Sequence, residues 1–279
     1  MIIPIGMKGN RIMELDADSL IYRAAFSAQQ SVDTESFALY LINRILGEIY
    51  EDTTCLKCNI YLGSKTNFRN EIATLYPYKG NRSNRERPSY FDLIRNYLID
   101  DCGAIVVEQQ EAEDAVGIEA IKHDSYDDYW VGAIDKDVRM IPGHHYNYIK
   151  RTFEFIEPIQ ALRCFYGQLA TGDKGVDNIP GAYHLLQLDG LEEEARLFKN
   201  SRYKSKVIKE LEQCNTEIEM WNILYALYVS TGEIERHGET RMLEIARLLW
   251  IRRYEDELWV PPTQRKYDYI STEAHKQLA

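Results

Sequence analysis

The chain has 279 residues, of which 45% are hydrophobic and 28% are charged, and its formal net charge is −11. This composition is that of a globular enzyme, and without an apolar run of about 18 residues or a secretory signal we expect neither a membrane span nor export. The odd count of five cysteines predicts free thiols in a reducing cytoplasm. The negative net charge disfavours binding of a polyanion such as a nucleic acid, unless basic side chains are clustered at one place on the surface.

Strand and helix patterns alternate through the first half of the chain. Short apolar runs predict strands at residues 11–15, 59–62, 104–107 and 130–134. Helical periods predict helices at residues 19–28, 35–50, 90–99 and 113–122. This alternation predicts an α/β fold with a mostly parallel sheet flanked by helices. The pattern after about Ile156 is mostly helical, so we expect an α/β core at 1–155 and a helical region at 156–279.

Acidic residues follow the predicted strands, where open α/β sheets bind ligands. Asp16 and Asp18 come after the first strand, and Asp135 and Asp137 after the fourth. The remaining acids of this pattern lie after the third strand and in a glycine-rich turn: Glu111, Glu113, Asp114, Asp173 and Asp177. Mg²⁺ and Mn²⁺ prefer carboxylate oxygens, and two such ions can activate water for phosphodiester hydrolysis. The ordered set therefore predicts a metal centre.

Each acidic group also has an ordinary structural explanation. An Asp-x-Asp pair after a strand is often a solvated turn or a helix cap. Glu113 and Asp114 would favour a helix N-terminus through its dipole, and Asp177, before Asn178 and Pro180, would suit a turn. The joint occurrence in chain order favours metal binding over these separate explanations.

A basic stretch with aromatic residues lies between two of the acidic groups. Lys79 and Arg82 are its central cations, and Tyr78 is placed to stack on an exposed base. Further candidate phosphate contacts are Arg69, Arg85, Lys136 and Lys174. A solvated basic loop is the alternative for this stretch.

The cysteines and adjacent histidines are not expected to bind metal. Cys55 and Cys58 lack partners for a zinc site and are expected to pack in the protein interior. His144 and His145 are expected at the surface.

Several motifs occur in an order that resembles the 5′→3′ exonuclease and flap endonuclease family, above all its stand-alone bacteriophage members. They are MELDAD at Asp16, FRNEIATLYPYKGNR, EAEDAVG, AIDKDVRMIP and TGDKGVDNIPG. Arg23 in the first predicted helix also resembles a phosphate-contacting arginine of that family. The likeness spans roughly Arg11 to Gly181.

The resemblance implies a PIN-like 5′ nuclease core and two Mg²⁺ or Mn²⁺ ions. Asp16, Glu111, Glu113, Asp114 and Asp135 would serve the first ion, and Asp137, Asp173 and Asp177 the second. Lys79 and Arg82 would guide the scissile phosphate beneath an arch at about 79–99, with Asp135 at the reacting centre. A helix–turn–helix-like motif at the glycine-rich turn would grip duplex DNA.

The implied substrates are DNA with 5′ ends, flaps or nicks, and RNA primers in RNA–DNA hybrids. Replication proteins are potential partners, no membrane is involved, and a phage-encoded chain would act in the host cytoplasm. Three positions depart from the family: Gly63 and Ser64 replace an aspartate, Glu113 replaces another, and one extra residue separates Asp173 from Asp177. Two alternatives stay open: a PIN-type ribonuclease, and a structure-specific DNA-binding protein with impaired catalysis.

Overall fold

A computed structural model describes residues 11–82, 86–199 and 201–265 of the chain, without the side chains of 197–203. The described chain divides into two compact units. The first comprises residues up to Asn67 together with Arg85–Ile156, and the second comprises Phe68–Asn84 with the chain from Glu157 onward. The predicted contact at Arg85 lies outside the described residues.

The first unit is built on one six-stranded sheet in the order β3-β2-β1-β4-β5-β6. Its strands are β1 (Ile12–Asp16), β2 (Lys57–Gly63), β3 (Ile105–Val107), β4 (Tyr129–Gly132), β5 (Gly143–Asn147) and β6 (Thr152–Ile156). All neighbouring pairs are parallel except β5 and β6, which form an antiparallel hairpin. The sequence prediction of a mostly parallel α/β sheet is thereby confirmed, while the hairpin at the edge had not been predicted.

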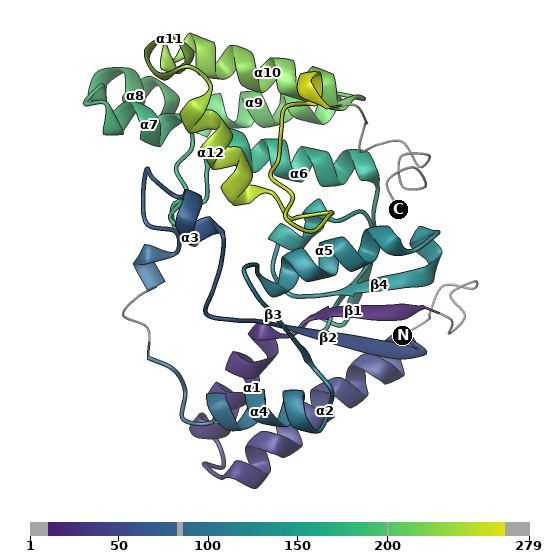
Figure 1. Cartoon of the computed structure of the whole chain (residues 1–279). Coiled ribbons are helices and arrows are strands. Elements are labelled where there is room, and N and C mark those ends of the chain that lie inside the picture. Colours follow the sequence, from purple (N-terminus) through teal and green to yellow (C-terminus); the bar gives the residue numbers. More distant parts are fainter. Residues whose placement is uncertain (1–10, 83–85, 200, 266–279) are drawn as a thin grey trace. The chain divides into compact units, whose positions relative to one another are not determined.

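Helices cover both faces of this sheet (Figure 1). On one face lie α1 (Asp18–Gln30), α2 (Glu35–Thr53) and α4 (Phe91–Asp100), and on the other lies α5 (Ala112–Lys122). Strand β1 explains this division, because Met13 and Leu15 point into the apolar core beneath α1 and α2. The alternate residues Glu14 and Asp16 are also buried but point to the α5 side of the sheet.

Local sequence signals fix where the helices begin. The Thr34 hydroxyl accepts from the Phe37 amide and caps α2. Glu111 and Asp114 form a reciprocal capping box at the start of α5. The capping box orients α5 after β3, and so it helps to set the positions of the acidic side chains there.

The second unit is helical. Its helices are α3 (Arg69–Ile72), α6 (Pro158–Thr171), α7 (Ala182–Leu188), α8 (Glu192–Lys199), α9 (Ser201–Gln213), α10 (Glu217–Ser230), α11 (Glu233–His237) and α12 (Thr240–Leu249). Helix α6 packs against α9, α10 and α12. The buried rings of Phe165, Trp250 and Trp259 meet at centroid separations of about 5 Å and anchor this core. No helix among the described residues is long and apolar enough to cross a bilayer.

The two adjacent histidines lie in β5, and their predicted place at the surface is wrong for His145. That ring is buried, and its Nε2 donates to the carbonyl oxygen of Ile141 over 2.7 Å. Burial is the main cause that lowers the pKa of His145 to about 4. The apolar surroundings arise because alternate residues of β5 point into the unit.

We expect the stability of the protein to fall as the pH drops from about 6.5 to about 4. In this window His145 is protonated in the unfolded chain but stays neutral in the folded chain. The free energy of unfolding therefore falls by at most about 1.4 kcal/mol for each pH unit. Urea unfolding at pH 7 and pH 5 measures this loss of stability. The difference in unfolding free energy between the two pH values should be smaller in His145→Gln than in the wild type. An identical pH dependence in the variant would show that His145 is not responsible.

Candidate metal centre and basic loop

The carboxyl ends of β1 and β4 form the natural ligand-binding crevice of the first unit. From β1 the chain continues to β2 and β3 on one side, and it later returns as β4 on the other side. Open α/β sheets bind ligands at such a switch in strand order. Asp16 is the last residue of β1, and Asp135 follows the end of β4 at Gly132. Both predicted ligands therefore lie at this crevice.

The two Asp-x-Asp motifs have the same local geometry. The backbone amide of Asp18 donates to Asp16 Oδ1 over 3.2 Å, and the amide of Asp137 donates to Asp135 Oδ1 over 3.0 Å. In each motif the first carboxylate is tied back by one oxygen to its own turn. This arrangement fixes both side chains at the sheet edge.

Asp16 is buried among other carboxylates. Burial is the main cause that raises its pKa to about 8, and the negative charge of Asp18 is the next. Asp135 and Glu111 raise it further, while the hydrogen bond from the Asp18 amide lowers it. Four acidic side chains thus share one small region, which is a costly arrangement without a compensating cation.

Asp18 belongs to this group, although the sequence prediction did not include it among the metal ligands. Its carboxylate accepts from the Gly63 amide, at 3.2 Å for Oδ1 and 3.1 Å for Oδ2. A Cβ atom on Gly63 would lie 2.8 Å from Asp18 Oδ2, which is too close for a real side chain. The missing side chain at the end of β2 therefore makes room for Asp18. A glycine at a strand end facing an aspartate was the available signal.

The acids that follow β3 have structural tasks as well. Glu111 receives a hydrogen bond from Asn67 Nδ2 over 2.9 Å, and the buried Asp114 accepts from the Glu111 amide over 3.0 Å. Glu113 is half-buried in the first turn of α5. Asp114 therefore caps helix α5, as the structural explanation expected. Its role as a metal ligand stays a prediction.

A buried hydroxyl lies close to the same carboxylates. Tyr148 is 3% exposed, and its Oη has no hydrogen-bond partner among the described residues. Burial raises the pKa of Tyr148 well above its usual value, and the charges of Asp16, Asp18 and Asp135 raise it further. A buried hydroxyl without a partner is unusual, so a bound group is expected to supply the missing acceptor.

The donor set fits a divalent ion in its chemistry, because all of its charged groups are carboxylates. No three of the strand-end oxygens converge within 4.8 Å; in the described residues only Asp189, Glu233 and His237 do so. That second group is already neutralised, since Arg241 donates to Asp189 over 2.7 Å and Arg236 over 3.0 Å. It is an ion-pair network of the helical unit.

The second unit joins the predicted basic loop to the glycine-rich turn. The Lys79 amide donates to the Asp177 carbonyl over 2.9 Å, and Asn178 Nδ2 donates to Pro77 O over 2.8 Å. Arg82 donates to Asp177 Oδ1 over 2.5 Å. Two motifs far apart in the sequence therefore form one structural element.

Glycine is required at both ends of that turn. Gly172 has φ +70°, and a Cβ on it would lie 2.3 Å from the Gly181 nitrogen. A Cβ on Gly181 would in turn lie 2.3 Å from the Thr171 carbonyl carbon. Asp173 and Asp177 are buried within the turn. Their predicted pairing with Asp137, which belongs to the first unit, stays a prediction.

Two predicted nucleic-acid contacts are buried, and their placement corrects the prediction. Arg69 is 1% exposed and donates to the carbonyls of Leu248 and Trp250. Tyr78 is buried, with the Lys79 ammonium 5.1 Å from its ring centroid. Because neither side chain reaches the surface in this arrangement, Arg69 stabilises the interior and Tyr78 presents no ring face to a base.

The other predicted basic contacts are more accessible. Lys136 and Arg23 are exposed, and Lys136 Nζ lies 4.0 Å from Asp137 Oδ1. Lys174 packs over the Tyr76 ring, and partial burial lowers the pKa of Lys174. Lys79 has φ +52° at the start of its turn. Arg23 and Lys136 belong to the first unit, whereas Lys79 and Lys174 belong to the second.

No protein-family model and no curated protein matches the chain. Among solved structures, a bacteriophage T5 flap endonuclease in a product complex with DNA and metal ions shares 16% identity at a TM-score of 0.48. That match covers 85% of this chain and 99% of the other. The zinc-bound bacteriophage T5 5′-exonuclease shares 17% identity at a TM-score of 0.47, covering 86% and 98%. Because these scores lie below 0.5, the function is argued from the residues of this chain.

Proposed function

We propose that this protein is a divalent-metal-dependent 5′ nuclease that hydrolyses phosphodiester bonds of DNA. The observation that carries the proposal is the meeting of Asp16, Asp18, Glu111 and Asp135 at the carboxyl ends of β1 and β4. The ordered motifs that resemble the 5′ nuclease family support it. The family that these motifs resemble acts on DNA, which suggests the substrate.

Divalent ions held at this edge would polarise a phosphate oxygen and lower the pKa of a water molecule. Asp16 and Asp135 would hold the first ion through the oxygens that their turns leave available, with Asp18 and Glu111 completing the ligand set. Lys79 would stabilise the charge that develops on the phosphate.

The proposed mechanism also includes a second divalent ion. It would use Asp137, Asp173 and Asp177, as the resemblance implies. Arg82 occupies Asp177 Oδ1 in the present arrangement, so this ion would have to displace the guanidinium. Released Arg82 would then be available to a phosphate, which links metal binding to substrate binding. Mg²⁺ or Mn²⁺ would serve, on DNA flaps, nicks and 5′ ends or on RNA–DNA hybrids.

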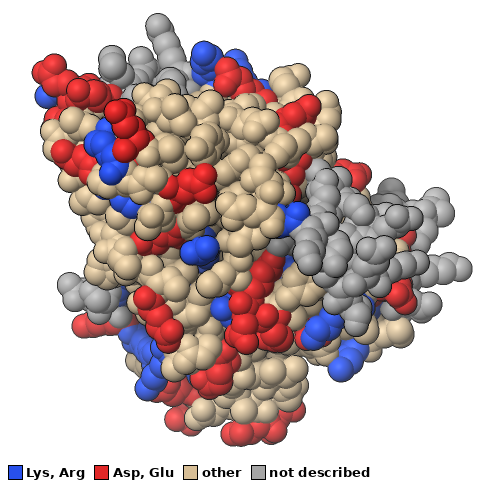
Figure 2. Space-filling view, turned by 45° about the horizontal axis from the view of Figure 1, so that its top comes forward, with Lys and Arg blue, Asp and Glu red and all other residues tan. Residues whose placement is uncertain are grey.

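The net charge of the chain favours a local binding face over a broad one. On the face shown in Figure 2, acidic side chains are spread widely and basic ones form small separate groups. With a formal net charge of −11, long-range attraction to DNA is weak. Binding would therefore depend on close contacts and bound cations, and added salt should weaken it.

Labelled substrates test the proposal. We expect cleavage of a 5′-flap, a nicked duplex or a DNA end with Mg²⁺ or Mn²⁺, and none with EDTA. An RNA–DNA hybrid and single-stranded RNA are the comparison substrates. Cleavage of single-stranded RNA alone would favour a PIN-type ribonuclease. Structure-selective DNA binding without any cleavage would favour a binding protein with impaired catalysis, and both results would refute the nuclease.

Asp18 gives a sharper test of the ligand set. Asp18→Ala should weaken Mn²⁺ binding about tenfold or more in isothermal titration calorimetry, because it removes one carboxylate from the centre. Asp100→Asn, on an exposed turn of α4, is the matched control and should bind Mn²⁺ like the wild type. Equal Mn²⁺ affinity in Asp18→Ala and the control would remove Asp18 from the site.

A further inference from the structure

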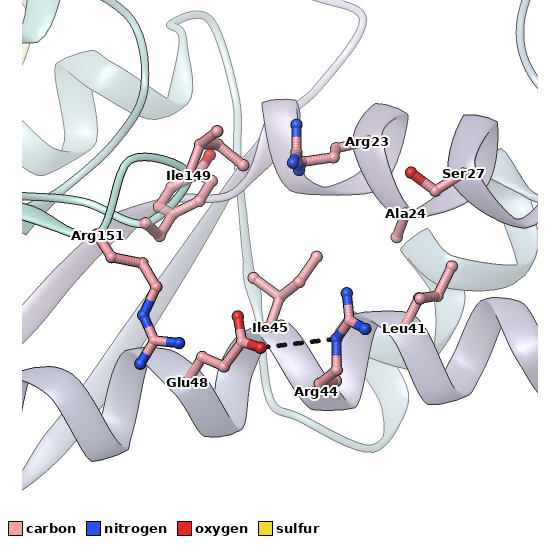
Figure 3. A pocket seen from close by; sticks show the side chains of 10 residues that line it. Arg23, Ala24, Ser27, Leu41, Arg44, Ile45, Glu48, Ile149 and Arg151 are labelled. Carbon is pink, nitrogen blue, oxygen red and sulfur yellow. Dashed lines mark ion pairs between the residues drawn. The ribbon is translucent and has the colours of Figure 1, made fainter.

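A small pocket lies in the first unit between α1, α2 and the turn that joins β5 to β6 (Figure 3). Its volume is about 110 Å³. Its polar lining consists of Arg23 and Ser27 from α1, Arg44 and Glu48 from α2, and Tyr148 and Arg151 from the turn. The remaining lining is apolar, from Leu41, Ile45 and Ile149 among others. The pocket is thus a polar recess on an apolar floor.

Positive charge dominates this lining. Three guanidinium groups face one carboxylate, that of Glu48. Glu48 lies 3.7 Å from Arg44, which is a weak ion pair on neighbouring turns of α2. Arg23 has no hydrogen-bond or ion-pair partner within the described part of the chain. Arg44 is paired with Glu48 and Arg151 with Asp52, so Arg23 supplies the positive charge that these ion pairs do not balance. A recess with this net positive charge is suited to an anion.

One cation of the pocket is held in a fixed orientation. Arg151 donates through two nitrogens to Asp52, which also accepts from the Tyr146 hydroxyl. The side-chain hydrogen bond from Arg151 is the first cause that lowers the pKa of Asp52. A guanidinium has five N–H donors, so the two nitrogens used here leave further donors for another acceptor. Arg151 is therefore a preorganised part of the wall.

The Tyr148 hydroxyl supplies the second, independent observation. Tyr148 lines this pocket, is 3% exposed, and has an Oη without a partner among the described residues. A buried hydroxyl without a hydrogen bond is energetically unfavourable. A ligand oxygen in the pocket would remove this cost.

We propose that this pocket binds a phosphate group. A tetrahedral anion with several acceptor oxygens matches the guanidinium groups and the hydroxyl that line this pocket from three elements. The source would be a phosphate of the DNA strand, which rests on the proposed function, or free inorganic phosphate. The resemblance to 5′ nucleases concerns Arg23 alone, whereas the pocket assigns new roles to Arg44, Arg151 and Tyr148.

Binding of inorganic phosphate to the full-length protein in EDTA tests the pocket without any turnover. We expect measurable binding in isothermal titration calorimetry, weakened about tenfold by Arg44→Gln, which removes a charge-assisted hydrogen bond. Tyr148→Phe should weaken it several-fold while preserving the fold, since no existing hydrogen bond is lost. Arg196→Gln, at an exposed position of α8, is the control and should bind as the wild type does.

Binding of an oligonucleotide distinguishes a DNA phosphate from free inorganic phosphate as the natural ligand of the pocket. If the pocket takes a DNA phosphate, Arg44→Gln also weakens binding of a labelled single-stranded oligonucleotide, and inorganic phosphate competes with it. If the pocket takes free phosphate, only the affinity for inorganic phosphate falls. Absence of phosphate binding, or equal affinity in wild type, Arg44→Gln and Tyr148→Phe, overturns the inference. Because EDTA is present, a protein that shows the expected pattern but never cleaves DNA would refute the nuclease and leave the pocket standing.

Discussion

Asp16→Asn is expected to reduce metal-dependent DNA cleavage at least about a thousandfold. Asp16 ends β1 at the strand-order switch, and its carboxylate is buried beside Asp18, Asp135 and Glu111. The substitution keeps the size of the side chain but removes a negative charge and an anionic ligand. Single-turnover cleavage of a 5′-flap substrate with Mg²⁺ measures the loss directly.

The same variant should fold and bind DNA, because its effect is on the metal centre. In EDTA at neutral pH we expect oligonucleotide affinity within several-fold of the wild type. We also expect wild-type stability, because the raised pKa already keeps Asp16 largely protonated when no metal is bound. Asp100→Asn on α4 is again the control, with unchanged cleavage. Full activity in Asp16→Asn would show that the carboxylates at this sheet edge are not the catalytic centre.

Arg69→Ala is expected to destabilise the second unit by about 3 kcal/mol. Nε of Arg69 donates to Leu248 O over 2.9 Å and Nη2 to Trp250 O over 2.8 Å. These carbonyls lie at the C-terminal end of α12, where the last turn lacks internal donors. A cation there also complements the helix dipole. Chemical denaturation of wild type and variant measures the difference.

Two comparison variants separate this capping role from a contact with nucleic acid. Arg69→Lys should remain destabilised, because an ammonium cannot reproduce the two bonds of the planar guanidinium. Arg196→Ala, an exposed arginine on α8, should change stability by less than about 0.5 kcal/mol. If Arg69→Ala kept wild-type stability but lost DNA affinity, the original prediction of a nucleic-acid contact would be correct and the interior role wrong.

The parallel part of the sheet was predictable because its strands are short apolar runs separated by helices with clear periods. Strand β1 is buried on both faces, with Met13 and Leu15 in the apolar core and Glu14 and Asp16 on the α5 side. The acids at the ends of β1 and β4 mark where these strands stop. The β5–β6 hairpin escaped prediction because the GHHYN sequence of β5 is polar although the strand is mostly buried, and the TFEFI strand β6 is mostly exposed at the edge of the sheet. The packing that buries His145 there depends on non-local contacts, which a local pattern does not encode.

The candidate site was predictable in its residue types but not in its contacts. The acidic motifs named Asp16, Glu111 and Asp135, and these side chains do influence one another. The bond between Asp18 and Gly63 and the pair of Arg82 with Asp177 join residues far apart in the sequence, so spacing could not show them. Arg69 was misassigned because a basic motif does not reveal whether its arginine points outward or into the core.

The most direct measurement is the incubation of the wild-type protein with a 5′-labelled flap duplex, with Mg²⁺ in one reaction and EDTA in the other. The proposed function predicts shortened labelled products from the 5′ strand with Mg²⁺ and an intact strand with EDTA. Intact DNA in both reactions, from a protein that is folded and binds Mn²⁺, would contradict a metal-dependent 5′ nuclease.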